Sequence, residues 1–222
     1  GDSIQVSLPL ARDILQSRAL RYDRDGDNHY DSASALIKSI RGSDPDAALY
    51  WMARMLKGGE DPLFIARRLI ISASEDVGNA DPHALLVAVA ATQAVQVIGM
   101  PEGRIPLAQA VTYLASAPKS NAAYLAINEA LQAVDEGRSY EVPSHLKDSS
   151  YRGSVRLGHG KDYRYPHDYK DHFVPQRYLP PELEGRRFYR PSNQGYEQRL
   201  KERLDRLHRR NSGREAQRGK DE

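Results

Sequence analysis

The sequence contains no cysteine, and this absence excludes several classes of protein at once. Without a thiol, the 222-residue chain can form neither disulfide bonds nor thiolate metal sites, and it offers no thiol nucleophile and no iron–sulfur ligands. No stretch approaches the roughly 18 consecutive apolar residues of a membrane-spanning helix. The first five residues also lack the basic and apolar segments of a secretory signal. We therefore expect a cytoplasmic protein without a membrane partner.

The sequence also lacks a large excess of either charge, because its 32 basic residues nearly balance its 30 acidic residues. This balance conceals a division of the chain. Residues 1–137 hold 12 basic and 17 acidic residues, whereas residues 138–222 hold 20 basic and 13 acidic residues. The second part also holds eight of the 13 tyrosines and five of the seven histidines. Composition therefore predicts an acidic, alanine-rich body followed by a basic tail.

The body has the apolar periodicity of α-helices. Three expected helices begin at an Asp-Pro pair, at residues 44–45, 61–62 and 81–82, where aspartate can cap the helix and proline is tolerated in the first turn. Apolar residues recur at helical spacing within residues 33–41, 45–57, 62–77, 85–98, 107–114 and 123–134, and a shorter helix is expected over 9–19. No alternating run of strand length competes with them. The sequence therefore predicts an all-α helical bundle.

The expected helix over residues 85–98 is apolar on nearly every side, since only three of its residues are polar. Such a helix must lie at the centre of a bundle or be covered by another subunit. The expected helix over 62–77 also has apolar residues beyond its main stripe. We therefore predict self-association through a surface that includes Phe64, Ile65, Ile71 and Val89.

The tail has a different pattern. Prolines and glycines recur between residues 138 and 191 at spacings that no α-helix tolerates. We expect an extended Tyr/Pro/His-rich strap there, which anchors its aromatic side chains on the body. A C-terminal helix is expected within residues 192–210, followed by a frayed end over 211–222.

Four charged residues are expected on the helix over 62–77: Arg67, Arg68, Glu75 and Asp76. Acidic residues near a helix C-terminus oppose the helix dipole, so they need partners. The two pairs are about 10–12 Å apart along the helix, which is too far for direct contact. We expect an interhelical ion-pair network, in preference to a direct role in ligand binding.

Five cations of the tail are candidates for contact with nucleic acid: Lys161, Arg164, Arg186, Arg187 and Arg190. They alternate with tyrosine and phenylalanine, a combination that can contact phosphates and stack on bases. The same cations could instead bind the acidic body. The residue pattern does not separate these two interpretations.

Two other kinds of site are disfavoured. Residues 153–162 resemble a phosphate-binding loop, but the lysine comes two residues late and no strand precedes it. The tail histidines and aspartates, among them His159, His167 and His172, match no helical metal-binding spacing. Hydrogen bonds that hold the strap in place are the favoured interpretation. A metal-dependent phosphohydrolase built on these histidines is a minor alternative.

Several motifs resemble the replication-associated recombination protein A family (RarA/MgsA), which includes the eukaryotic Werner-helicase-interacting protein. They are YDRDGDNHYD at 22–31, KSIRGSDPDAALYW at 38–51, GEDP at 59–62, ASED at 73–76, PKSNAAY at 118–124, YPHD at 165–168 and QRYLP at 176–180. The resemblance extends from about residue 19 to residue 207. Members of this family are AAA+ ATPases, related to clamp loaders, that act on DNA at stalled replication forks.

The resemblance implies a C-terminal part of such an ATPase. Residues 1–20 then correspond to the end of the lid domain or a linker helix, and residues 21–137 to a clamp-loader-collar-like domain that assembles a homotetramer. The family's Walker motifs, sensors and arginine finger have no counterpart in this sequence. The resemblance therefore implies that this sequence contains no catalytic, cofactor-binding or metal-binding residues. ATP and magnesium would bind the ATPase core.

We therefore expect a homotetramerisation domain, not itself an enzyme, of a DNA-dependent ATPase in replication-fork maintenance and recombination. Its expected partners are other copies of itself, DNA, and replisome components such as single-strand-binding protein. The expected location is the cytoplasm, in association with the nucleoid. The alternative is a free-standing nucleic-acid-binding helical module in which assembly is incidental.

Overall fold

The computed structural model describes residue 8 and residues 27–136, 140–150 and 159–218. These residues form α-helices, short 3₁₀ helices and irregular segments, with no β-strand among them, so the all-α prediction is confirmed. The helix expected over residues 9–19 lies outside the described residues. The chain divides into two compact units, which are described separately below. Unit 1 comprises residues 1–124 and 194–197, and unit 2 comprises residues 125–193 and 198–222.

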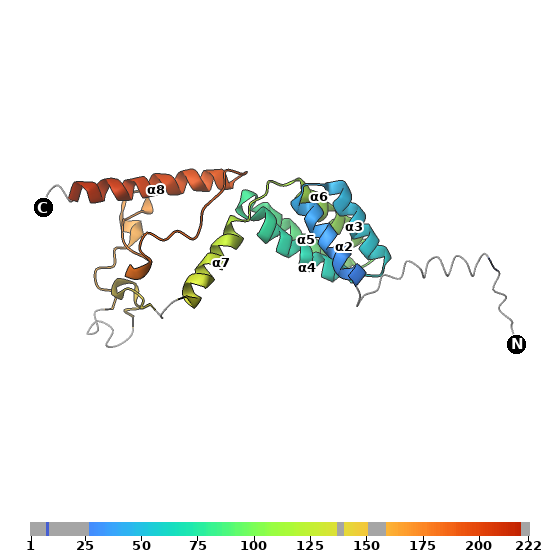
Figure 1. The fold of residues 1–222 in the computed structure, drawn as a ribbon, viewed down its shortest axis with the longest axis horizontal. Helices are drawn as coiled ribbons and strands as arrows, with labels where there is room; N and C mark the ends of the chain where they lie inside the picture. The colour runs from blue at the N-terminus through green and yellow to red at the C-terminus, as the bar shows by residue number, and fades with distance from the viewer. Residues whose placement is uncertain (1–7, 9–26, 137–139, 151–158, 219–222) are drawn as a thin grey trace. The chain divides into compact units, whose positions relative to one another are not determined.

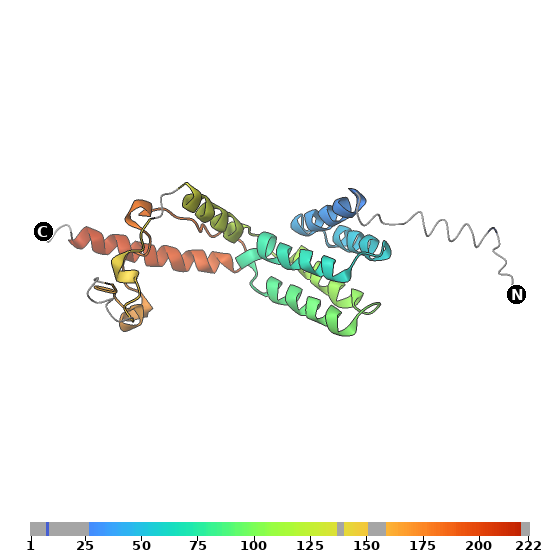
Figure 2. The same cartoon turned by 90° about the horizontal axis from the view of Figure 1, so that it is seen from below.

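Unit 1 contains a bundle of α-helices, visible in Figure 1 and, after a 90° turn, in Figure 2. Its helices are α2 (Asp27–Arg41), α3 (Pro45–Lys57), α4 (Pro62–Ser72), α5 (His83–Ile98) and α6 (Arg104–Ser116). Helix α2 packs against α3, α4 and α6, while α5 packs against α4 and α6. The core between them is made of large aliphatic side chains, the most buried being Leu36, Ile40, Met55, Ile65, Leu69, Leu107 and Leu114.

Two of the three Asp-Pro pairs begin helices as predicted. The Asp44 carboxylate accepts a hydrogen bond from the Ala47 amide at 2.9 Å, and Asp61 accepts one from the Leu63 amide at 2.9 Å. At the third pair the helix begins one residue later, at His83, whose amide donates to Asp81 at 3.0 Å. Asp81 also accepts a hydrogen bond from the Tyr113 hydroxyl at 2.6 Å, which ties the start of α5 to α6.

Helix α4 ends in a π-helical turn over Ala73–Val77. A loop after α6 approaches this turn closely, because the Ser120 amide donates to the Asp76 carbonyl at 2.8 Å. Gly78, the residue that follows the turn, has a φ of 51°. A Cβ atom at this position would lie 2.7 Å from the Ser120 carbonyl oxygen. Glycine is therefore required where the two segments meet.

Unit 1 also contains residues 194–197, the last of which is the first residue of α8 (Glu197–Arg218). The Tyr196 amide donates to the Ala80 carbonyl at 2.7 Å, and Gly195, with a φ of 50°, allows this approach. Glu197 is fully buried and accepts a hydrogen bond from the Ser120 hydroxyl. A buried carboxylate needs such partners, so this contact fixes where α8 begins.

Unit 2 contains most of α7 (Ala122–Asp135), the described parts of the strap, and α8 after its first residue. The division between the units therefore falls at Tyr124, inside α7, earlier than the expected boundary at residue 137. Helix α8 begins at Glu197, inside the range expected for the C-terminal helix, and continues to Arg218, well into the segment that we expected to be frayed.

The described strap contains only short 3₁₀ helices, as its prolines predict. Its internal hydrogen bonds include one from the Gln176 amide group to the Arg164 carbonyl at 2.9 Å. Its most buried apolar side chain is Val174, at 2% exposure. Tyrosines 163, 165, 169 and 178 are exposed, and the expected anchoring of the strap on the body stays a prediction.

The capping geometry of α3 predicts a measurable loss of stability. Replacement of Asp44 by Ala removes the acceptor for the Ala47 amide and should lower the free energy of unfolding by about 1 kcal/mol. Urea unfolding at a fixed protein concentration measures this change. The control is Asp31→Ala, at an exposed position inside α2, which should change the value by less than about 0.5 kcal/mol. Equal effects of the two substitutions would contradict the capping role.

Candidate self-association surface and its polar support

Helix α5 reverses the usual distribution of side chains in an amphipathic helix. Its buried positions are occupied mainly by alanine, at residues 84, 88 and 91, together with Val95. Its exposed positions include larger aliphatic residues, which we call the α5 face: Leu85, Leu86, Val89 and Val97. Leu86 is 65% exposed and Val97 is 85% exposed. Because large aliphatic side chains gain the most free energy from burial, the α5 face is a candidate contact surface.

The residues that the sequence assigned to an interface differ in exposure. Ile71 at the end of α4 and Val89 on the α5 face are exposed, at 44% and 36%. Phe64 is half-buried, with its ring 4.7 Å from the ring of His29. Ile65 is fully buried in the core of unit 1. The assignment of Ile65 to an interface is therefore corrected, because its own chain already covers it.

Helix α7 presents a second exposed apolar surface, which lies in unit 2 apart from its first residue. We call it the α7 stripe, and its members are Tyr124, Ile127, Leu131 and Val134. Their spacings of three, four and three residues place them on one face of the helix, as in the contact seam of a coiled coil. Ala133, away from this face, is buried. Helix α7 therefore has one covered side and one apolar side that no residue in the described ranges covers.

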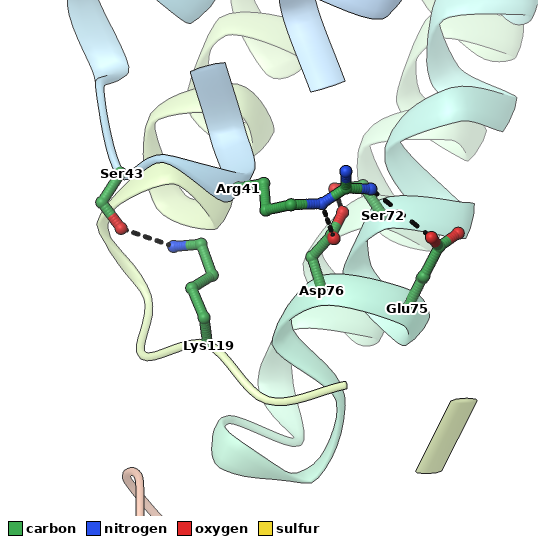
Figure 3. Close-up of polar contacts among 6 residues, drawn as sticks. All are labelled: Arg41, Ser43, Ser72, Glu75, Asp76 and Lys119. Atoms are coloured by element: carbon green, nitrogen blue, oxygen red, sulfur yellow. Dashed lines mark hydrogen bonds and ion pairs between the residues drawn. The ribbon is translucent and has the colours of Figure 1, made fainter. Parts of the chain in front are cut away.

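A polar network joins α2 to the π-helical turn after α4 (Figure 3). The Arg41 Nε donates to Asp76 Oδ1 at 2.5 Å, and the Ser72 hydroxyl donates to Asp76 Oδ2 at 2.7 Å. A longer contact of 3.4 Å joins Arg41 to Glu75. Asp76 is buried, and its hydrogen bond and charge raise the pKa of Arg41 above the usual value. The network therefore keeps a buried carboxylate paired on both oxygens.

The four charged residues that the sequence predicted to form an interhelical ion-pair network have different partners in the structure. Glu75 and Asp76 contact Arg41 on a different helix, as described above. Arg67 lies 3.6 Å from Asp61 at the start of its own helix, so its contact is local. Arg68 forms no ion pair with any residue in the described ranges.

Lys119 supports the same region from the loop after α6 (Figure 3). Its Nζ donates to the carbonyls of Ala115 and Ala117, at 3.0 and 2.5 Å, and to the Ser43 hydroxyl at 3.2 Å. Burial lowers the pKa of Lys119, and the nearby charge of Asp76 opposes this shift. The ammonium group thus satisfies carbonyl groups at the C-terminal end of α6.

Two of the tail cations contact acidic residues of unit 2, namely Glu129 in α7 and Glu136 directly after it. Arg190 Nη1 lies 2.6 Å from Glu129 Oε1, and Arg186 Nη1 lies 3.8 Å from Glu136 Oε2. The hydrogen bond from Arg190 lowers the pKa of Glu129. These contacts support the interpretation in which tail cations bind acidic residues of the same chain.

The other three tail cations differ among themselves. The Arg164 guanidinium donates to the Pro175 carbonyl and is used inside the strap. Lys161 and Arg187 are exposed, and neither has an ion pair with a residue that the structure describes. Of the five candidates, only these two have no hydrogen bond or ion pair with a residue in the described ranges.

The tail histidines lie near polar and aromatic groups. His145 Nε2 lies 2.7 Å from the Arg177 carbonyl oxygen, and the rings of His167 and His172 are 4.8 Å apart. Within the described ranges, no group of three histidine, aspartate or glutamate side chains is arranged to hold a metal ion. In the same ranges, no helix combines the length and apolar character needed to span a membrane.

Sequence reasoning missed Arg41, Ser72 and Lys119, which complete the polar network. A partial indication existed, because the acidic pair Glu75-Asp76 required a cation. The choice of Arg41 depends on the packing of two helices whose paired residues are 35 positions apart. That packing could not be read from local spacing.

Comparison with known proteins shows that two family models match this chain. Residues 42–208 match the family model described as MgsA AAA+ ATPase C terminal, and residues 1–41 match the model described as AAA C-terminal domain. The replication-associated recombination protein A of Haemophilus influenzae is 48% identical over 204 residues, which cover 91% of this chain and 46% of the relative.

Two further relatives extend the comparison. An uncharacterized AAA domain-containing protein of Mycobacterium tuberculosis is 52% identical over 91% of this chain and 45% of its own length. The ATPase WRNIP1 of Dictyostelium discoideum is 41% identical over 79% of this chain and 20% of its own length. The chain thus spans about half the length, or less, of these curated relatives.

The polar network predicts a specific cost for the loss of Arg41. In Arg41→Met the buried Asp76 carboxylate loses its charged partner, so the free energy of unfolding at pH 7 should fall by about 2–4 kcal/mol. The control is Lys38→Met, one turn earlier on α2, where an exposed cation is removed and a change below about 0.5 kcal/mol is expected. Denaturant unfolding of both variants measures the difference. Indistinguishable values would contradict the role of the network.

Proposed function

Because the chain belongs to the family of MgsA AAA+ ATPase C-terminal domains, we propose that it is the self-association part of a longer DNA-dependent ATPase. The longer protein would act in replication-fork maintenance and recombination, in line with the printed name of its relatives, replication-associated recombination protein A. In this proposal ATP and magnesium bind the ATPase core, which the match to C-terminal models does not include.

The observation that carries the proposal is the reversed helix α5. A soluble monomer rarely exposes apolar patches larger than a few hundred Å². The α5 face exposes four large aliphatic residues while alanines of the same helix are buried. Contact with a second copy would remove these side chains from water, and obligate interfaces of this apolar kind bury about 2,000 Å² or more in total.

The proposed assembly is a homotetramer. Among the described residues we distinguish two apolar surfaces, the α5 face in unit 1 and the α7 stripe, which lies almost entirely in unit 2. A tetramer with dihedral symmetry uses two different self-complementary interfaces on each subunit. Two surfaces therefore match the number of interfaces that a closed tetramer of this kind requires.

DNA and replisome components, including single-strand-binding protein, are the proposed partners of the whole protein. We propose a nucleoid-associated, cytoplasmic location for it. The alternative is a free-standing nucleic-acid-binding helical module, in which self-association is incidental. In that case the α5 face would have no effect on assembly, so the experiment below separates the two functions.

The test introduces one charge into each apolar surface. We expect the wild-type chain to sediment as a tetramer, with Leu86→Asp and Leu131→Asp each reducing it to a smaller species, because a buried unpaired carboxylate is costly. The double variant should be a monomer with an unchanged helical circular dichroism spectrum. Equilibrium sedimentation at micromolar concentrations measures the masses.

The control for this test is Ala53→Asp, which adds the same charge at an exposed position of α3 outside both surfaces. It should remain a tetramer. A wild-type monomer, or single variants that stay tetrameric, would contradict the proposal.

A further inference from the structure

Helix α8 carries a row of arginines along one face. The helix contains eight lysines and arginines against four acidic residues. Arg199, Arg203 and Arg206 are separated by four and three positions, which places them within about 60° of arc around the helix axis. All three are exposed. We call them the arginine stripe, and it extends over about 10 Å of the helix.

The members of the arginine stripe have no ion pair with any residue in the described part of the chain. Two acidic residues are adjacent to the stripe in sequence, Glu202 beside Arg203 and Asp205 beside Arg206. The Glu202 carboxylate accepts a hydrogen bond from Gln198 at 3.2 Å. Three arginines of the strap are paired, since Arg177 contacts Glu184, Arg186 contacts Glu136 and Arg190 contacts Glu129. The arginine stripe therefore stands out as a regular set of cations whose charge is not compensated by a paired carboxylate.

We propose that the arginine stripe binds the phosphate backbone of duplex DNA. Guanidinium groups are permanently charged and form bidentate hydrogen bonds with phosphate oxygens. A rigid helix holds the three groups in a row, which suits a regular line of negative charges. This inference rests on the proposed function, and it places the DNA contact on α8 instead of the strap.

The composition of α8 favours duplex over single-stranded DNA. Proteins that bind single strands combine cations with aromatic side chains on which the bases stack. Helix α8 contains no tyrosine, phenylalanine or tryptophan. Contacts restricted to phosphates carry no sequence information, so binding should not depend on base sequence.

The experiment measures binding of the 222-residue chain to a fluorescein-labelled DNA duplex of random sequence by anisotropy, over a series of salt concentrations. The variant is Arg199→Gln, Arg203→Gln and Arg206→Gln together, because glutamine keeps the helix propensity of arginine. Loss of three phosphate contacts should flatten the slope of log K against log salt by about 2 to 3. Affinity for the duplex should fall about tenfold or more at low salt.

The matched control is Arg177→Gln, Arg186→Gln and Arg190→Gln together. It removes the same charge from unit 2, but from arginines that already contact Glu184, Glu136 and Glu129. The control should retain most of the salt slope. An equal loss of salt slope in both variants would mean that only the net charge of the chain matters, and it would overturn the inference. An unchanged slope in the stripe variant would also overturn it.

Two further measurements distinguish a failure of the DNA-binding inference from a failure of the proposed self-association. Charge-matched poly-glutamate should bind more weakly than the duplex, and equal binding would assign the stripe to an acidic protein and overturn the DNA proposal. Equilibrium sedimentation of the stripe variant should give the wild-type mass. If DNA binding does not depend on the stripe while the mass is that of a tetramer, the inference fails and the proposed self-association stands.

Discussion

The packing of α5 is the constraint on which the rest of the account depends. Alanines on its inner face let it approach α4 and α6 closely, while the space between the other helices is filled by larger residues such as Leu69 and Leu107. The large aliphatic side chains of α5 then have no room inside the bundle. They remain on the surface, where contact with a second copy of the chain, as we propose, would remove them from water. The assembly that we propose follows from this distribution of side-chain size around a single helix.

A second constraint is the meeting point of the π-helical turn, the loop after α6 and the start of α8. Asp76 contributes its carboxylate to Arg41 and Ser72, and its carbonyl to the amide of Ser120. Ser120 in turn donates from its hydroxyl to the buried Glu197. Hydrogen bonds to buried charges are expensive to lose, so this chain of contacts fixes the local geometry of unit 1. The widened turn and Gly78 make room for the contact with the loop after α6.

Much of the fold could be predicted from local patterns. The Asp-Pro pairs gave the starts of α3 and α4, and the apolar spacing gave the positions of the helices of unit 1. The all-round apolar character of α5 indicated a partner surface, but not which of its residues face inward, because that depends on how closely its neighbours pack. The same reason explains the error at Ile65, which the core covers. The pairing of Asp76 with Arg41 and the use of Arg164 inside the strap depend on tertiary contacts, so they had no local signature.

The absence of native cysteine allows a direct measurement of whether the α5 face is covered. A thiol at Leu86→Cys should react slowly with a maleimide when the chain is assembled, and faster on dilution as the copies separate. A thiol at Ala53→Cys, on an exposed part of α3, should react fast at every concentration. Slow, concentration-dependent labelling at residue 86 alone is the result that the account predicts. Fast labelling at both positions, independent of concentration, would contradict it.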